Sequence, residues 1–131
     1  MASGGRVHPS KHKVSGFFRG PARVWLAGEK GPGLAMSRSI GDYTAHTVGV
    51  IPDPVVTVQT LEPEDQIIVI ASDGVWEVMT NLDVAMVAMQ YYPQEKAESA
   101  ANAVVTQANQ KWRESGKTST DDITCVVLFL D

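Results

Sequence analysis

Acidic residues at the ends of two apolar segments are the side chains in this sequence best suited to chemistry. Asp73 follows the apolar run 66–72, and the pair Asp121 and Asp122 stands directly before the apolar run 123–130. A strand end fixes the direction of a side chain and leaves it at the rim of the sheet, which suits a metal ligand. If the two runs form neighbouring strands, Asp73 and Asp121 meet at one edge, and carboxylate oxygens favour Mg²⁺ or Mn²⁺ over zinc.

The same residues have a plainer interpretation, which the spacing alone leaves open. Asp73 and Gly74 form an Asp-Gly pair, which after a strand is most often only a turn. Asp121 and Asp122 follow a polar stretch and fit a solvated loop end equally well. The metal interpretation therefore needs support beyond these spacings.

The sequence context of the other reactive side chains does not support a catalytic role. His8 and His12 stand four apart, but Pro9 and the surrounding glycines oppose a helix that would present both to one ion. His46 is isolated in the sequence. Cys125 lies inside an apolar run without a basic neighbour to lower its pKa, so we expect it to pack in the core. No GxxxxGK[ST] motif is present, which excludes a P-loop nucleotidase.

Three strands are predicted in the part of the chain that must position the aspartates. Residues 55–60 are β-branched and lie between Pro54 and a turn-prone acidic stretch. Residues 66–72 and 123–130 are continuous apolar runs of strand length. The short polar link between the first two runs predicts an antiparallel hairpin. We expect the strands at 66–72 and 123–130 to be covered on both sides, since neither has a polar face.

Two helices are predicted between the second and third strands. Thr80, with Asp83 three residues later, forms a capping box, and this helix should run to about Tyr92, where a proline prevents simple continuation. It is apolar nearly all round, so we expect it to be buried. The next helix is amphipathic, because small apolar residues recur at three- and four-residue steps over 97–112, and Gly116 supplies its stop.

The N-terminal part of the chain is rich in glycine and in positive charge. The first 33 residues hold seven glycines and three prolines, which predicts loops with one short strand at 23–26. Residues 1–41 hold seven Lys or Arg against one Glu, whereas the rest hold four against 14 Asp or Glu. Such a segment could attract phosphate groups on a phosphorylated partner or on nucleic acid, but it fits a solvated loop with scattered lysines equally well. Nucleic acid is not favoured, because no aromatic platform is interleaved with the charges.

Composition places the chain among ordinary globular proteins. Its 131 residues are 44% hydrophobic and 20% charged, which excludes a disordered tail or a fibrous repeat. No stretch approaches the roughly 20 apolar residues that span a bilayer, and residues 1–20 lack the apolar core of a secretory signal, so we expect no membrane association. A single cysteine excludes an internal disulfide framework and predicts a reducing intracellular compartment, cytoplasm or nucleus.

Three segments, in this order along the chain, resemble the late motifs of a known enzyme family. They are GLAMSRSIGD at 33–42, IIVIASDGVWEVM at 67–79 and STDDITCVV at 119–127. They resemble the metal-dependent Ser/Thr protein phosphatases of the protein phosphatase 2C type, whose motifs read like LAVSRSLGD, an apolar run ending in (S/C)DG(I/V)W(D/E), and DN(I/M)(S/T) or DDI(S/T) before a last strand. Residues 4–26 look like the end of the family's flap region, so the resemblance covers the whole chain.

The resemblance implies an α+β fold, with a mainly antiparallel β-sheet packed with two α-helices as part of an α-β-β-α sandwich. It also implies hydrolysis of phosphoserine and phosphothreonine in a phosphorylated protein substrate, by water activated on a binuclear Mg²⁺ or Mn²⁺ centre. Asp73 matches a metal-bridging aspartate and Asp121 a later metal ligand. Asp122 is expected to contact these ligands and not the metal itself. Arg38 and Asp42 match structural positions, and we expect an internal ion pair between them.

The family's N-terminal motifs are absent from this sequence. It contains no DGHGG motif, so we expect residues 1–131 to be the C-terminal part of a catalytic domain, either a piece of a longer chain or a truncated gene product. Residues 1–33 would be the flap-like segment and residues 34–131 the sheet and two helices. With about half the ligands missing, metal binding should be weak or absent and the chain alone inactive. We also expect the uncovered sheet to cause self-association.

Two rival functions stay open. The first is a non-catalytic interaction module that resembles a phosphatase and binds a partner through its exposed sheet and basic loop, although retention of Asp73 and Asp121 argues mildly against it. The second is a phosphate- or nucleic-acid-binding protein that uses the basic segment 1–41, and its affinity would fall steeply with salt.

Overall fold

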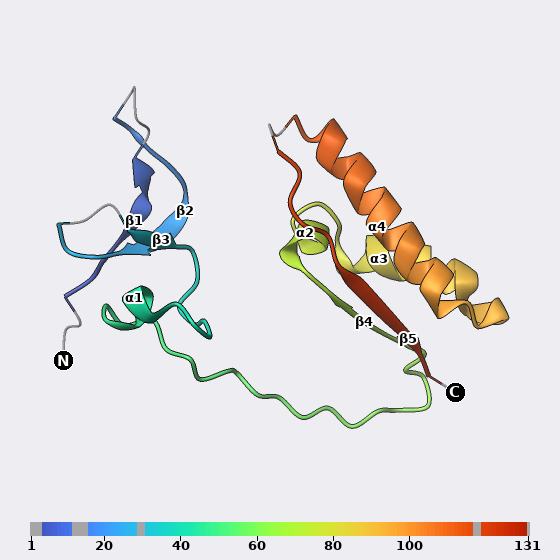
Figure 1. The fold of residues 1–131 in the computed structure, drawn as a ribbon. Coiled ribbons are helices and arrows are strands. Elements are labelled where there is room, and N and C mark those ends of the chain that lie inside the picture. The colour runs from blue at the N-terminus through green and yellow to red at the C-terminus, as the bar shows by residue number, and fades with distance from the viewer. Residues whose placement is uncertain (1–3, 12–15, 29–30, 117–118, 131) are drawn as a thin grey trace. The chain divides into compact units, whose positions relative to one another are not determined.

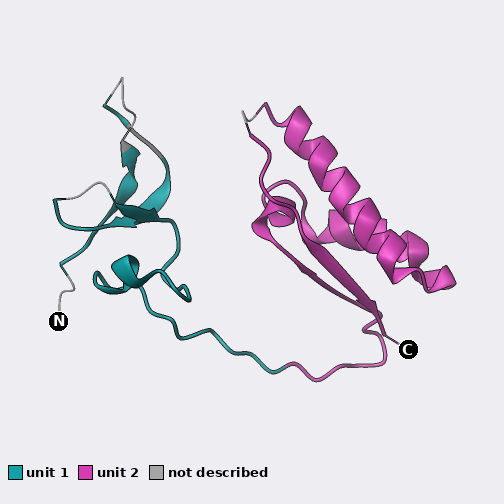
Figure 2. Cartoon of the chain, in the orientation of Figure 1, with its two compact units in different colours: residues 1–58 teal, residues 59–131 magenta. Residues whose placement is uncertain are grey.

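The computed structural model describes residues 4–11, 16–28, 31–116 and 119–130. Contacts divide the chain into two compact units, residues 1–58 and residues 59–131, which Figure 2 colours separately. Figure 1 labels the helices and strands of both units. Among the described residues, none of the helices has the length and apolar character needed to span a bilayer.

The first unit is built on a three-stranded antiparallel sheet with strand order β1-β2-β3. Its elements are β1 (Arg6–Lys11), β2 (Phe18–Trp25), β3 (Pro32–Leu34) and the short helix α1 (Tyr43–His46). The strand predicted at 23–26 lies almost entirely within β2, but β1, β3 and the first part of β2 lie where loops were predicted, and there the prediction is wrong. Pro9 explains the error for β1, because it lies in this edge strand beside a register shift, where a missing N–H is tolerated.

Contacts of Trp25 hold this small sheet together. Its indole Nε1–H donates to the His8 carbonyl at 2.8 Å, and its ring stacks on the His8 imidazole with centroids 5.3 Å apart. Gly33 has a φ of +68° and lies so near the Trp25 ring that a Cβ there would be 2.8 Å from it. His8 therefore packs against a tryptophan, while His12, the other histidine of the pair, lies outside the described residues.

Hydrogen bonds fix the charged side chains of the loop after β3. Arg38 Nη1 donates to the backbone carbonyl of Asp53 at 2.6 Å, and the Asp42 carboxylate accepts from Ser39 Oγ at 2.5 Å. The His46 ring contacts the Ser39 carbonyl at 2.9 Å. The expected ion pair between Arg38 and Asp42 does not form in the described part of the chain, because each charge is hydrogen-bonded to a different loop atom.

The second unit packs its helices on one face of a two-stranded antiparallel sheet, as Figure 1 shows. Its elements are β4 (Ile67–Ala71), α2 (Asp73–Trp76), α3 (Asn81–Ala88), the 3₁₀ helix η1 (Met89–Gln94), α4 (Ala97–Glu114) and β5 (Cys125–Phe129). β4 pairs with β5 from Ile67 opposite Phe129 to Ala71 opposite Cys125. The expected α+β class, with an antiparallel sheet, is confirmed.

The strand predicted at 55–60 is wrong. These six described residues form no strand, and all of them are exposed. A β-branched composition favours extended backbone, but a strand also needs a partner. In the part of the chain that the structure describes, the partner of β4 is β5, so the predicted hairpin between 55–60 and 66–72 does not exist.

The capping box before α3 is confirmed. Thr80 Oγ1 accepts from the Asp83 N–H at 3.2 Å, and the Asp83 carboxylate accepts from the Thr80 N–H at 2.9 Å. The α-helix nevertheless gives way to η1 before its predicted end, because the ring of Pro93 clashes with the carbonyl four residues earlier. The helix is not buried all round, since Leu82 is 67% and Met86 is 54% exposed.

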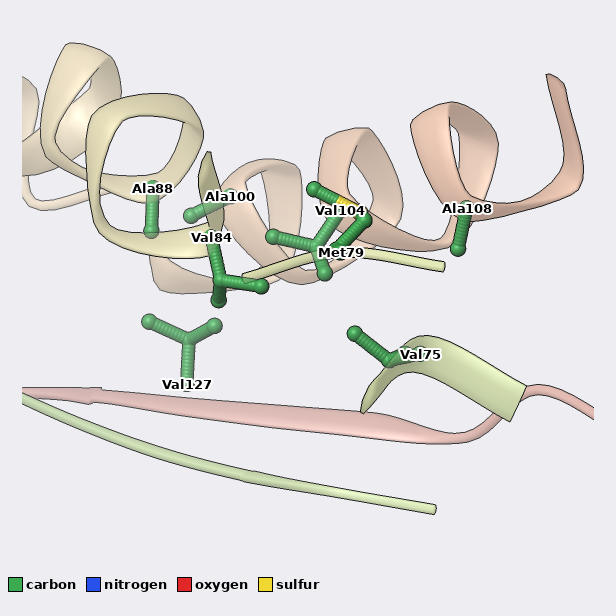
Figure 3. Close-up of a cluster of buried hydrophobic side chains, with 8 residues drawn as sticks. All are labelled: Val75, Met79, Val84, Ala88, Ala100, Val104, Ala108 and Val127. Carbon is green, nitrogen blue, oxygen red and sulfur yellow. The ribbon is translucent and has the colours of Figure 1, made fainter. Parts of the chain in front are cut away.

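The amphipathic helix predicted over 97–112 is confirmed as α4. Gly116, with a φ of +69°, follows its end and is the predicted stop. Small side chains on the buried face of α4 let it lie close to α3 and β5. The core of the unit, drawn in Figure 3, consists of Val75, Met79, Val84, Ala88, Ala100, Val104, Ala108 and Val127.

The two-stranded sheet buries one of its faces. Val127 points toward the helices in Figure 3 and is buried. On the opposite face, which we call the outer sheet face, Ile70, Val126 and Leu128 are 67%, 58% and 53% exposed. The expectation that both strands are covered on both sides is therefore wrong for these three residues, because the helices of the second unit pack on the opposite face.

Candidate metal centre

The segment after β4 presents two carboxylates on one side of a helical turn. Ser72 is the N-cap of α2 and Asp73 is its first residue, so the Asp-Gly pair starts a helix and does not form a simple turn. Glu77 follows four residues after Asp73, and its N–H donates to the Asp73 carbonyl at 2.8 Å. Residues four apart in a helix lie on one face, so both side chains project from the same side.

Strand pairing brings a third carboxylate to this turn. Ala71, at the end of β4, lies opposite Cys125, at the start of β5, so the segment before β5 passes the end of β4 (Figure 1). Asp121 lies in that segment. One carboxylate oxygen from each of Asp73, Glu77 and Asp121 lies within 4.8 Å of the other two, and all three residues are exposed. The fold thus brings together the two aspartates that the sequence analysis selected.

The donor set fits a hard divalent cation. Three carboxylates this close repel one another, and a divalent cation between them offsets that repulsion. Oxygen donors are the ligands that Mg²⁺ and Mn²⁺ take, whereas thiolate and imidazole ligands are those of structural zinc sites. The chemistry of these residues therefore matches the ion that the sequence analysis expects.

Asp122 contacts the site through its backbone. Its N–H donates to Asp121 Oδ1 at 2.9 Å, and its carbonyl accepts from the Ser72 hydroxyl at 3.0 Å. The Asp122 side chain is exposed. Its N–H therefore orients one oxygen of Asp121, while a role for its carboxylate stays a prediction.

Close packing fixes α2 in place. Gly74 has no room for a side chain, because a Cβ there would overlap the carbonyl oxygen of Asp122. The Gly74 carbonyl accepts a hydrogen bond of 2.6 Å from the Trp112 indole, and the Trp76 indole donates to the Ala71 carbonyl at 2.9 Å. The turn that carries Asp73 is therefore attached to α4 on one side and to β4 on the other.

Glu77 is the member of this candidate site that sequence analysis missed. The sequence feature that could have selected Glu77 is its four-residue spacing from Asp73. That spacing places two side chains together only when the segment between them is helical, and an Asp-Gly pair after a strand predicts a turn instead. The helical turn at Asp73–Trp76 therefore had to be known before Glu77 could be selected.

Cys125 packs as expected and offers no nucleophile. It contacts the core cluster of the second unit, and burial raises the pKa of its thiol. A raised pKa keeps the sulfur protonated at neutral pH, so little thiolate is available for attack.

Comparison with known proteins gives the family. Residues 1–115 match the family model described as Protein phosphatase 2C. This chain belongs to the protein phosphatase 2C family. Probable protein phosphatase 2C 12 of Oryza sativa subsp. japonica is 43% identical to it over 98% of this chain and 31% of that relative. Probable protein phosphatase 2C 61 of Arabidopsis thaliana is 42% identical over 83% of this chain and 33% of that relative.

A solved structure supports the fold. A serine-threonine phosphatase 2C from Toxoplasma gondii matches 98% of this chain with a TM-score of 0.81 and 23% sequence identity, a level that shows the fold alone. This chain covers 41% of that structure and about a third of the length of the two relatives named above. The resemblance inferred from three motifs is therefore confirmed for the family and the fold.

Proposed function

We propose that this chain supplies metal ligands to a protein serine/threonine phosphatase, with Asp73 and Asp121 as ligands and Glu77 beside them. The observation that carries the proposal is the approach of these three carboxylates to within 4.8 Å, in a chain of the protein phosphatase 2C family. The ion is Mg²⁺ or Mn²⁺, because all the donors are carboxylate oxygens. Residues 1–131 are then the C-terminal part of a catalytic domain.

The proposed reaction is hydrolysis of phosphoserine and phosphothreonine by water. When bound at such a centre, divalent cations supply positive charge that neutralises phosphoryl oxygens and acidifies water. The role of this chain is to hold the cations in place, with Asp73 and Glu77 on one helical turn and Asp121 on the loop before β5. The raised pKa of the Cys125 thiol agrees with a route that needs no covalent phosphoenzyme.

We propose that the isolated chain binds the metal weakly and is inactive. Three carboxylates are an incomplete shell for an ion that takes about six oxygen ligands and gives up its waters reluctantly, so the dissociation constant should be on the order of millimolar or weaker. A phosphopeptide assay on the isolated chain tests this point. Turnover of about 1 s⁻¹ or faster, an ordinary enzyme rate, would contradict it.

The experiment that tests the function joins this chain to the part of the domain that it lacks. The portion of the rice relative that precedes the matched region, fused to this chain, should give Mn²⁺-dependent hydrolysis of a phosphothreonine peptide. Asp73→Asn and Asp121→Asn should each abolish that hydrolysis. Asp53→Asn is the matched control, because Asp53 is exposed in the first unit and its hydrogen bond to Arg38 uses the backbone carbonyl. Hydrolysis that both site variants retain would refute the proposal.

The second candidate function is a non-catalytic interaction module, which the outer sheet face favours. Ile70, Val126 and Leu128 expose apolar surface side by side on β4 and β5. Among the described residues, each of these strands pairs with the other alone, so each leaves one edge able to accept a further strand. We propose that a second copy of the chain covers this face in solution. Restored hydrolysis in the fusion would favour the enzyme over the module.

A further inference from the structure

We propose that Ser72 is a positioning residue whose hydroxyl sets the separation of the Asp73 and Asp121 carboxylates. The inference rests on the proposed metal centre and adds to it a residue that holds the ligands without being one. Ser72 lies between β4 and α2, next to Asp73 in the chain, and its side chain reaches the segment that carries Asp121.

The Ser72 hydroxyl is hydrogen-bonded in both directions to that segment. It donates to the Asp122 carbonyl at 3.0 Å and accepts from the Thr124 N–H at 3.0 Å. The backbone N–H of Ser72 also donates to the Thr124 carbonyl at 3.0 Å. These contacts lie just beyond the last ladder pair, Ala71 opposite Cys125, so they continue the attachment of the two segments past the end of the sheet.

This use of the hydroxyl differs from ordinary helix capping. An N-cap serine usually accepts from an N–H in the first turn of its helix. In Ser72 no side-chain cap bond to α2 is made, and the Val75 N–H bonds to the Ser72 carbonyl at 3.0 Å. The hydroxyl is therefore directed to the neighbouring loop and not to its own helix.

A short series of contacts links this hydroxyl to a proposed ligand. Ser72 Oγ holds the Asp122 carbonyl, which also lies against Gly74, where a Cβ would overlap it. The N–H of the same residue, Asp122, donates to Asp121 Oδ1 at 2.9 Å. A movement of the Asp122 backbone therefore moves an oxygen of Asp121, while Asp73 stays attached to Ser72 by one peptide bond.

The test uses Mn²⁺ alone as the probe and the whole 131-residue chain. In the wild-type chain, Mn²⁺ should broaden the amide NMR signals around residues 73–77 and 119–124. Ser72→Ala should lower the broadening per added Mn²⁺ by about tenfold, the usual effect of losing a group that orients a metal ligand. Without metal, the Thr124 amide should exchange faster with solvent, because its acceptor is gone. Ser72→Thr keeps the hydroxyl, so it should restore most of the broadening by Mn²⁺ and most of the protection of the Thr124 amide from exchange.

Matched variants distinguish failure of the positioning role of Ser72 from failure of the metal centre itself. Thr106→Ala also removes a hydroxyl bonded to a backbone carbonyl, that of Asn102 at 2.8 Å on α4, and should change the broadening by less than about twofold. Broadening that Ser72→Ala leaves unchanged, or that Ser72→Thr fails to restore, overturns the positioning role and leaves the metal centre standing. Absence of local broadening in the wild-type chain, or its survival in Asp73→Asn, refutes the metal centre and the positioning role together.

Discussion

The indole of Trp112, in α4, donates a 2.6 Å hydrogen bond to the carbonyl of Gly74, in α2. Trp112 is 5% exposed, and Gly74 is buried, so the bond lies within the core of the second unit. It joins the longest helix to the turn that begins with Asp73. This contact therefore contributes both to the stability of the unit and to the placement of Asp73.

Trp112→Phe tests that contact. The phenyl ring keeps most of the apolar packing but leaves the buried Gly74 carbonyl without its donor, and we expect a loss of about 1–3 kcal/mol in the free energy of unfolding. Urea denaturation followed by circular dichroism measures it. Trp76→Phe is the control, since Trp76 is 38% exposed and its indole bonds to Ala71 near the surface. Equal losses in the two variants would contradict the account.

The capping box predicts an acid-sensitive contribution to stability. The pKa of Asp83 is lowered from 3.8 to about 2, first by the hydrogen bond from the Thr80 N–H and then by the Lys111 ammonium and the Thr80 hydroxyl. Since the folded state favours the charged carboxylate, this contribution is fully present above pH 3.8 and is lost as the pH falls toward 2. The midpoint urea concentration of unfolding should therefore fall less between pH 3.8 and about 2 in Asp83→Asn than in the wild type. Parallel curves for the two proteins would show that the box contributes nothing.

Gly74→Ala should disturb the proposed centre without touching a ligand. The new Cβ would overlap the Asp122 carbonyl, so the loop before β5 must move, and overpacking of this kind destabilises by about 1–3 kcal/mol. Thermal unfolding measures the effect. Gly31→Ala is the matched control, because a Cβ at Gly31 meets no atom within 4 Å, and its effect should stay below about 0.5 kcal/mol. A Gly74→Ala chain as stable as the wild type would show that the close approach is not required.

The outer sheet face predicts self-association. At about 0.1 mM, light scattering should give a mass above that of the monomer, because an open apolar face of this kind normally finds a partner. Ile70→Lys should shift the mass toward the monomer. Leu82→Lys is the matched control, since Leu82 is also 67% exposed but lies on α3. A monomeric wild-type chain, or equal effects of the two lysines, would contradict the proposal.

The parts of the fold that follow from short-range patterns could be predicted from the sequence. The Thr80–Asp83 capping box and the amphipathic period of α4 both lie within a few turns of chain, and both are confirmed. The approach of Asp73 to Asp121 followed from the assumption that two apolar runs are neighbouring strands, which the β4–β5 ladder satisfies. Metal binding by these residues remains a proposal.

The errors arose where structure depends on a partner. Residues 55–60 have strand composition but no paired strand, and β1 contains Pro9 yet pairs well because an edge strand and a register shift tolerate it. The apolar pattern of β4 and β5 predicted burial on both faces, but burial requires an element that covers each face. Glu77 was missed for a related reason, since its spacing from Asp73 has meaning only within the helical turn that the fold provides.

The most direct test of the metal centre is a crystal structure of the chain grown with Mn²⁺, with diffraction measured at the manganese absorption edge. We expect an anomalous difference peak in contact with the carboxylates of Asp73 and Asp121, and its disappearance in the Asp121→Asn variant. Well-ordered carboxylates at these two positions without an anomalous peak beside them, in crystals saturated with Mn²⁺, would contradict this expectation.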